Sequence, residues 1–176
     1  MLAGRVAGQN SAIGLHSSMK LYFGAALLVI SRLAFATLAV ETWSTATATR
    51  PSDGWVLVYR FADRLSPELK KSNQPERVTI TWRYIGNNGL PATSERKSMD
   101  ALEDVINGLG PTTATLVFVA TGNNRRQWVY YAKSASSFVG AVRNVQSKAS
   151  AVPLEFEAAP DPSWTFHESF VRSIRR

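Results

Sequence analysis

The fold is decided by Thr121-Gly122-Asn123-Asn124-Arg125-Arg126-Gln127-Trp128-Val129-Tyr130-Tyr131, a stretch that predicts the turn and second strand of a β-hairpin. The apolar run 115–120 precedes it and predicts the first strand. Gly and Asn adopt the positive φ angles that tight turns require, while β-branched and aromatic residues suit a pleated surface. The stretch also holds two adjacent arginines and three aromatic rings, which makes it a candidate binding surface.

Hydrophobic periodicity predicts the elements on either side of this hairpin. Apolar residues alternate over residues 78–84, which is typical of a strand covered on one face. A stripe with steps of three and four residues follows, over 99–109, and predicts a helix whose start is marked by Ser94 and Glu95. A second helix is predicted over 134–146, and a short strand over 152–157. Proline and two glutamates in that last strand predict an edge position.

Residues 77–158 are thus predicted to run strand, helix, strand, strand, helix, strand. This order is typical of the split βαβ, or ferredoxin-like, arrangement. The sequence therefore predicts one α+β domain over residues 55–176. It includes an extra N-terminal strand at 55–61, whose place in the sheet the pattern leaves open. A C-terminal helix is expected to begin with Asp161 as its cap and Pro162 in its first turn.

The net charge of +7 is concentrated at the two ends of the chain. Residues 1–50 carry four basic side chains and one acid, and the last five residues add three arginines. Residues 51–171 carry thirteen basic and twelve acidic side chains, so the body is close to neutral. This distribution argues against nucleic acid as the partner, because affinity for nucleic acid depends on many basic contacts.

The first 39 residues contain no acid and resemble an export signal. The apolar run 21–30 is followed by Ala34-Phe35-Ala36, a small-x-small cleavage site, with Thr37-Leu38-Ala39 as a second candidate. Residues 1–39 are therefore predicted to be a signal peptide, with Met1 or Met19 as the start, and the protein to be exported to the periplasm or medium. The alternative is a membrane anchor over residues 21–40, in which Arg32 would be costly. Residues 40–54, rich in Thr, Ala and Ser, are predicted to be a linker.

Several landmarks occur in an order that resembles the bacterial domain-of-unknown-function family 695. They are Trp55 to Tyr59, the stretch 84–91, the acidic helix 100–104, the stretch 125–131, and Asp161-Pro162-Ser163-Trp164. The resemblance covers residues 54–171. It implies no defined activity. Some relatives are joined to, or similar in shape to, protein regulators of a bacterial ribonuclease, and the resemblance therefore implies a binding role. A cytoplasmic partner of that kind would be in doubt for an exported chain.

Two Gly-Asn-Asn turns form the candidate site. If strands 77–85 and 113–120 run parallel, the turns at 86–89 and 122–125 lie at the same end of the sheet, near the start of the first helix. Free amides at a helix start favour an anion, and the arginines could assist. The alternative is two ordinary turns with solvated arginines. The candidate binding residues are Asn87, Asn88, Asn123, Asn124, Arg125 and Arg126.

The sequence offers little support for catalysis. It contains no cysteine, metal-ligand spacing, phosphate-binding loop or dinucleotide fingerprint, so no cofactor or metal is predicted. His167 lies on the last predicted helix without a glycine-flanked serine elsewhere, and Glu103 and Asp104 point apart on a helix. Asp161 and Trp164 have a structural explanation as a cap and a docked ring.

The predicted function is a small binding or regulatory module for an unidentified protein partner. One alternative is an enzyme acting on a small polar or anionic substrate at the Gly-Asn-Asn end. A second is an RNA-binding sheet, which 126–131 echoes only loosely.

Overall fold

The computed structural model describes residues 41–52, 54–149 and 153–175. The predicted signal peptide or anchor, including both candidate starts and both cleavage sites, lies outside the described residues. None of the described helices is long and apolar enough to span a membrane.

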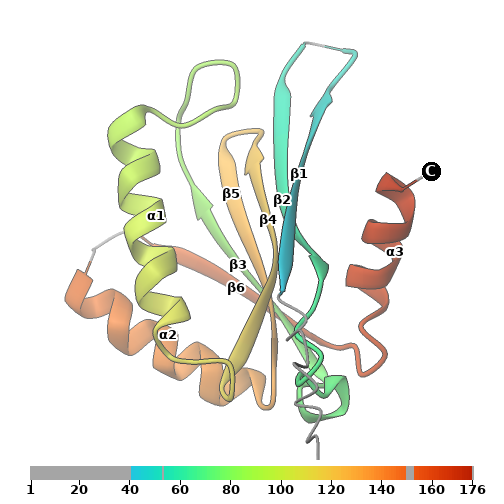
Figure 1. The fold of residues 1–176 in the computed structure, drawn as a ribbon. Coiled ribbons are helices and arrows are strands. Elements are labelled where there is room, and N and C mark those ends of the chain that lie inside the picture. Colours follow the sequence, from blue (N-terminus) through green and yellow to red (C-terminus); the bar gives the residue numbers. More distant parts are fainter. Residues whose placement is uncertain (1–40, 53, 150–152, 176) are drawn as a thin grey trace, which may run out of the picture. The chain divides into compact units, whose positions relative to one another are not determined.

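The described residues form an α+β domain around a six-stranded antiparallel sheet, as Figure 1 shows. The strand order across the sheet is β1-β2-β4-β5-β3-β6. The strands are β1 (Thr42–Thr49), β2 (Val56–Arg64), β3 (Glu76–Arg83), β4 (Ala114–Gly122), β5 (Arg125–Ala132) and β6 (Leu154–Pro160). The helices are α1 (Thr93–Asn107), α2 (Ala135–Ala149) and α3 (Thr165–Ile174), with a short 3-10 turn at Lys71–Asn73.

Helices α1 and α2 cover one face of the sheet, and α3 lies against the other (Figure 1). The alternation along β5 explains how one strand supplies both layers. Trp128 and Tyr130 belong to the core under α1 and α2, whereas Val129 and Tyr131 belong to the core under α3. Successive side chains of a strand point to opposite faces, so this strand is apolar on both sides.

The predicted hairpin is confirmed as β4 and β5, and its tip is Asn123-Asn124. Both asparagines have positive φ angles, 51° and 57°. Strands β3 and β4 each pair antiparallel with β5, so they run in the same direction, as predicted. Strand β6 lies at an edge of the sheet, also as predicted.

The predicted linker is wrong for residues 42–49, which form the edge strand β1 and pair with β2. The domain therefore begins before residue 55. Apart from Trp43, β1 consists of Thr, Ser and Ala, and most of its side chains are exposed, so no apolar alternation marks the strand. The strand left unplaced by the sequence is β2, which lies between β1 and β4.

Two helix starts also differ from the prediction. Helix α1 begins at Thr93 after Ala92, and no side chain caps it, so Ser94 lies inside the helix. Helix α3 begins at Thr165, after Asp161 and Pro162 have formed a turn. The Asp161 carboxylate still accepts hydrogen bonds from the amides of Thr165 (2.8 Å) and Phe166 (3.1 Å). It therefore caps the helix, although it lies four residues before the first helical residue.

Trp164 anchors α3 to the sheet. Its ring is fully buried and stacks on Tyr131 with centroids 3.9 Å apart. Its Nε1 donates to the carbonyl of Gln74 at 2.9 Å. The backbone of Trp164 has a φ of 55°, a conformation that is unfavourable for a bulky residue. Burial of the ring therefore holds a strained turn in place.

His167 lies buried between α3 and β2. Its Nε2 donates to the carbonyl of Ala62 at 2.7 Å, since a carbonyl can only accept. Its Nδ1 has no partner among the described residues. Burial lowers the pKa of His167 below its usual 6.5; Lys71 also lowers it, while the hydrogen bond to Ala62, Glu168 and Asp63 oppose the shift.

This arrangement predicts acid sensitivity. The imidazole has a pKa near 6.5 in the unfolded chain and a lower pKa in the folded protein. Its contribution to the free energy of unfolding is therefore fully present above pH 6.5 and decreases as the pH falls below that value. We expect the free energy of unfolding, measured by urea denaturation, to fall between about pH 7 and pH 5. His167→Gln keeps an amide donor for Ala62 and should flatten that slope. An equal slope in both proteins would contradict this account.

A second prediction concerns Trp164. Trp164→Ala removes the buried ring and its hydrogen bond, and should lower the free energy of unfolding by about 3 to 5 kcal/mol. Trp43 is the control, because its side chain is 37% exposed on β1. Trp43→Ala should cost less than about 1 kcal/mol. Urea denaturation of the two variants compares the costs, and similar values would contradict the anchoring role of Trp164.

Candidate functional site

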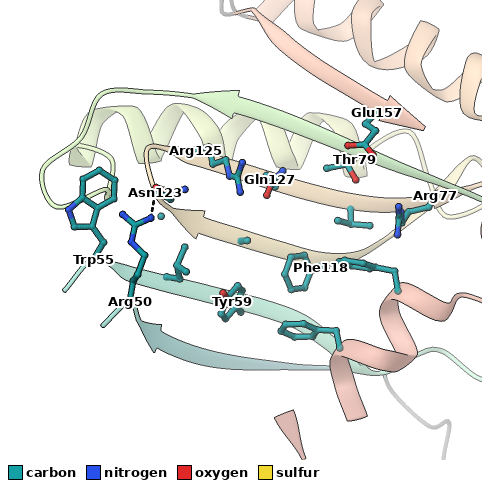
Figure 2. A pocket seen from close by; sticks show the side chains of 16 residues that line it. Arg50, Trp55, Tyr59, Arg77, Thr79, Phe118, Asn123, Arg125, Gln127 and Glu157 are labelled. Atoms are coloured by element: carbon teal, nitrogen blue, oxygen red, sulfur yellow. Dashed lines mark hydrogen bonds between the residues drawn. The ribbon is translucent and has the colours of Figure 1, made fainter. Parts of the chain in front are cut away.

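A groove of about 500 Å³ lies on the sheet face that α3 only partly covers (Figure 2). Its floor is made by β2, β4, β5 and β3, and Glu157 of β6 reaches its border. Phe166 and Phe170 of α3 close one end, and Trp55 and Asn123 stand at the other. The groove therefore runs from α3 to the hairpin tip.

Small residues in β4 create the space. Ala120 and Gly122 line the groove, where larger side chains would fill it. Gly122 has a φ of 144°, and a Cβ on it would lie 2.4 Å from the carbonyl oxygen of Val56. The close approach of β2 and β4 therefore requires glycine at this position.

An aromatic cluster forms the α3 end of the groove. Phe118 contacts Phe170 edge to face, with centroids 4.6 Å apart, and Phe166 at 5.4 Å. Tyr59 contacts Phe118 at 5.8 Å and Phe170 at 5.5 Å. These rings pack on one another in tilted and edge-to-face pairs, which are the favourable geometries for aromatic contacts. The end wall is therefore held by mutual packing.

Cationic side chains dominate the charge of the groove. Arg50, Arg77 and Arg125 line it, against one carboxylate, that of Glu157. Arg77 and Arg125 form no ion pair within the described part of the chain. The Arg77 guanidinium lies 5.1 Å from the Phe166 ring centroid. These two half-buried guanidiniums can therefore take a carboxylate or another anion without breaking a salt bridge in that region.

The hairpin end of the groove is built by residues far apart in the sequence. Arg50 donates to the Asn123 side-chain oxygen at 3.3 Å, and its guanidinium lies 4.8 Å from the Trp55 ring centroid. Figure 2 shows these three side chains together beside the hairpin tip. The turn after β1 is thereby tied to the turn between β4 and β5.

The two Gly-Asn-Asn turns do lie against each other, and Asn124 links them. Its side-chain oxygen accepts from the Gly86 amide at 3.2 Å, its amide donates to the Gly89 carbonyl at 3.0 Å, and its carbonyl accepts from Tyr84 at 3.0 Å. The Tyr84 hydroxyl donates to Gly89 at 2.8 Å, and burial raises the pKa of Tyr84 to about 12. The amides of Tyr84, Gly86 and Asn124 are thus engaged within the protein and are not available to an anion.

Of the six binding residues predicted from the sequence, the fold places some in the groove and others outside it. Asn123 and Arg125 line the groove. Asn124 serves the contact between the turns, and Asn87 and Asn88 are exposed on the loop after β3, outside the groove lining.

Arg126 lies on the opposite sheet face and is only 7% exposed. Its guanidinium donates to Asp100 of α1 at 2.5 Å and to Thr121 at 3.0 Å. Adjacent residues of a strand point to opposite faces, so Arg125 and Arg126 cannot share one surface. Arg126 therefore lies outside the groove that Arg125 lines.

Several groove residues lie outside the site predicted from the sequence, namely Arg50, Tyr59, Arg77, Thr79 and Gln127. A signal for some of them is present, because the side of β3 opposite its apolar face carries Arg77 and Thr79. A polar face on a central strand indicates that nothing apolar covers it. Tyr59 and Arg50 carry no such signal, since their position depends on where β2 pairs.

Other candidate residues have structural roles. Glu103 is buried, forms an ion pair with Arg60, and accepts from Trp128 Nε1 at 2.8 Å. Tyr131 donates to Asp161 at 2.5 Å. Burial alone would raise the pKa of Asp161, but its hydrogen bonds from Tyr131, Phe166 and Thr165 outweigh that effect and lower it. Among the residues that the structure describes, no cluster of His, Asp and Glu could hold a metal ion.

Comparison with known proteins gives the family. No curated protein and no solved structure matches the chain. Residues 41–171 match the family of unknown function DUF695. The matched region begins one residue before β1 and extends into α3, so it contains the whole sheet and the groove. The chain therefore belongs to the DUF695 family.

Proposed function

We propose that this domain is a binding module whose groove takes an extended, acidic segment of a protein partner. The observation that carries the proposal is the pair of half-buried guanidiniums, Arg77 and Arg125, without an ion-pair partner in the described residues. Charges removed from water are normally paired, so two partly buried arginines in one groove favour an anionic ligand.

The shape of the groove favours a segment of chain over a compact ligand. The groove lies across several strands of an uncovered sheet face, between α3 and the hairpin tip (Figure 2). Thr79 and Gln127 place hydrogen-bonding groups along the floor, and the aromatic cluster offers apolar contact at the α3 end. An acidic segment with an aromatic or aliphatic side chain would match both features.

An RNA ligand has less support, because the rings of the groove are engaged. Base stacking needs an aromatic face that is free. Tyr59 and Phe118 pack on each other and on α3, and Arg50 lies over Trp55. The charge of residues 51–171 is also close to balanced.

An enzyme acting on a small polar or anionic substrate is the second candidate. Asn123 and Arg125 could orient such a substrate, but Glu157 is the one carboxylate in the groove lining and that lining contains no histidine. General acid–base catalysis needs a titratable group placed beside the reacting atom. We therefore place binding first.

The finer description of the fold is also a proposal. We propose that β3, α1, β4, β5, α2 and β6 form a split βαβ, ferredoxin-like core, extended by β1 and β2. The order β4-β5-β3-β6 and the position of α1 and α2 on one face support it.

Binding by the groove is tested with a fluorescent peptide of alternating Glu and Tyr and a Gln-Tyr peptide as its neutral counterpart. We expect the acidic peptide to bind more tightly, with an affinity that falls as salt rises. Arg77→Glu and Arg125→Glu should each weaken it about tenfold or more, which corresponds to about 1.4 kcal/mol. Fluorescence anisotropy provides the measurement.

Matched variants separate the groove from the surrounding surface. Arg96→Glu changes charge equally on an exposed position of α1 and should leave affinity unchanged. Asn88→Gly and Asn123→Gly both suit positive φ angles, 50° and 51°, but only Asn123 lines the groove, so only Asn123→Gly should weaken binding. Equal loss with Arg96→Glu, or tighter binding of single-stranded RNA than of the peptide, would overturn the proposal.

We also propose that the protein is exported after cleavage of its first residues. Cleavage after Ala36 or Ala39 would leave the sheet whole, because β1 begins at Thr42. We expect N-terminal sequencing of protein from the periplasm or medium to begin at Thr37 or Val40. Chain with an intact start in the membrane fraction would support the anchor over residues 21–40 instead, and intact chain in the cytosol would contradict export.

A further inference from the structure

The two edges of the sheet differ in how they are protected from further pairing. Strand β6 is preceded by Pro153 and ends at Pro160, and it carries Glu155 and Glu157. Proline and charge are the usual devices that prevent an edge strand from pairing with another chain. The β6 edge is therefore protected.

Strand β1 has none of these devices along its length. It consists of Thr42-Trp43-Ser44-Thr45-Ala46-Thr47-Ala48-Thr49, an eight-residue strand without proline or charge, and most of its side chains are exposed. It pairs with β2 on one side, and no strand pairs with its other side in the described part of the chain. Its outer edge thus offers backbone donors and acceptors to a further strand.

The charges that flank β1 favour a second copy of the same strand. Glu41 precedes it, and Arg50, whose guanidinium also contacts Asn123 and Trp55 within the same chain, follows it. In an antiparallel pair of two copies, the acidic end of each strand lies near the basic end of the other. A parallel pair would bring like charges together. The edge is therefore complementary to itself in one orientation.

We propose that β1 pairs antiparallel with β1 of a second copy and joins the two sheets into one. A two-fold axis perpendicular to the sheet generates this pair, so each face of one copy continues into the same face of the other. Each β1 side chain then lies opposite a side chain on the same face of the joined sheet. The two-fold axis passes beside Thr45 in one possible register and beside Ala46 in the other. In either register Trp43, which is 37% exposed, lies opposite a threonine, a favourable aromatic and β-branched pair.

This interface has a consequence for the groove but does not depend on its proposed function. Both grooves would open on the same side of the joined sheet, and α1 and α2 of both copies would lie on the other. The contact is one pair of strands, so the dimer is expected to depend on concentration.

The test uses the full chain in sedimentation equilibrium and hydrogen exchange. We expect the average mass to rise from one chain toward two with concentration. As it rises, those amides of residues 42–49 that point away from β2 should exchange more slowly, because the alternate amides already face β2 in a single copy. Thr45→Glu/Thr47→Glu places like charges across the axis and should weaken association about tenfold or more. Ala158→Glu on the β6 edge is the control and should leave association unchanged.

A charge-swapped pair distinguishes repulsion from damage to the strand. Thr45→Lys/Thr47→Lys alone should associate as weakly as the Glu variant, and mixing the two variants should restore the dimer. A monomer at every concentration would overturn the proposal. An undiminished dimer in the Glu variant, or a mixture that stays monomeric, would also overturn it. So would protection, independent of concentration, of the amides of residues 42–49 that point away from β2, since that would indicate cover from within the same chain.

Discussion

Strand β5 holds the domain together because it pairs along its whole length with both β3 and β4. All eight of its residues have a partner in β3, and the hairpin joins it to β4. Its side chains alternate between two cores, with Trp128 and Tyr130 under α1 and α2, and Val129 and Tyr131 under α3. Both layers therefore depend on the register of one strand, since a shift of one residue would exchange the two faces.

The sequence predicted the parts of the fold whose apolar period is visible. The alternation in β3, the stripe of α1 and the hairpin around Asn123 all reflect local contacts with a covered face. Strand β1 was missed because an edge strand of threonine and alanine has no apolar face to reveal it. The start of α3 was misplaced because Asp161 caps the helix from a distance, across a turn held by the buried ring of Trp164.

The candidate site could be predicted only in part. The meeting of the two Gly-Asn-Asn turns followed from strand direction, which the order of elements determined. The groove itself depends on contacts between distant elements, namely the position of β2 beside β4 and the limited reach of α3 across the sheet. The alternation of side chains along a strand does predict that Arg125 and Arg126 lie on opposite faces of β5, as the structure shows.

The Asn124 contacts hold the hairpin end of the groove in a fixed arrangement. One residue joins two turns through its side chain, amide and carbonyl, and Gly89 packs so closely that a Cβ on it would lie 2.7 Å from the Trp55 ring. The hairpin end of the groove is thus held in place by contacts within the protein before any ligand binds. Conformational entropy lost on association at this end would come from the ligand, and a ligand that is already extended would bind with the smaller loss.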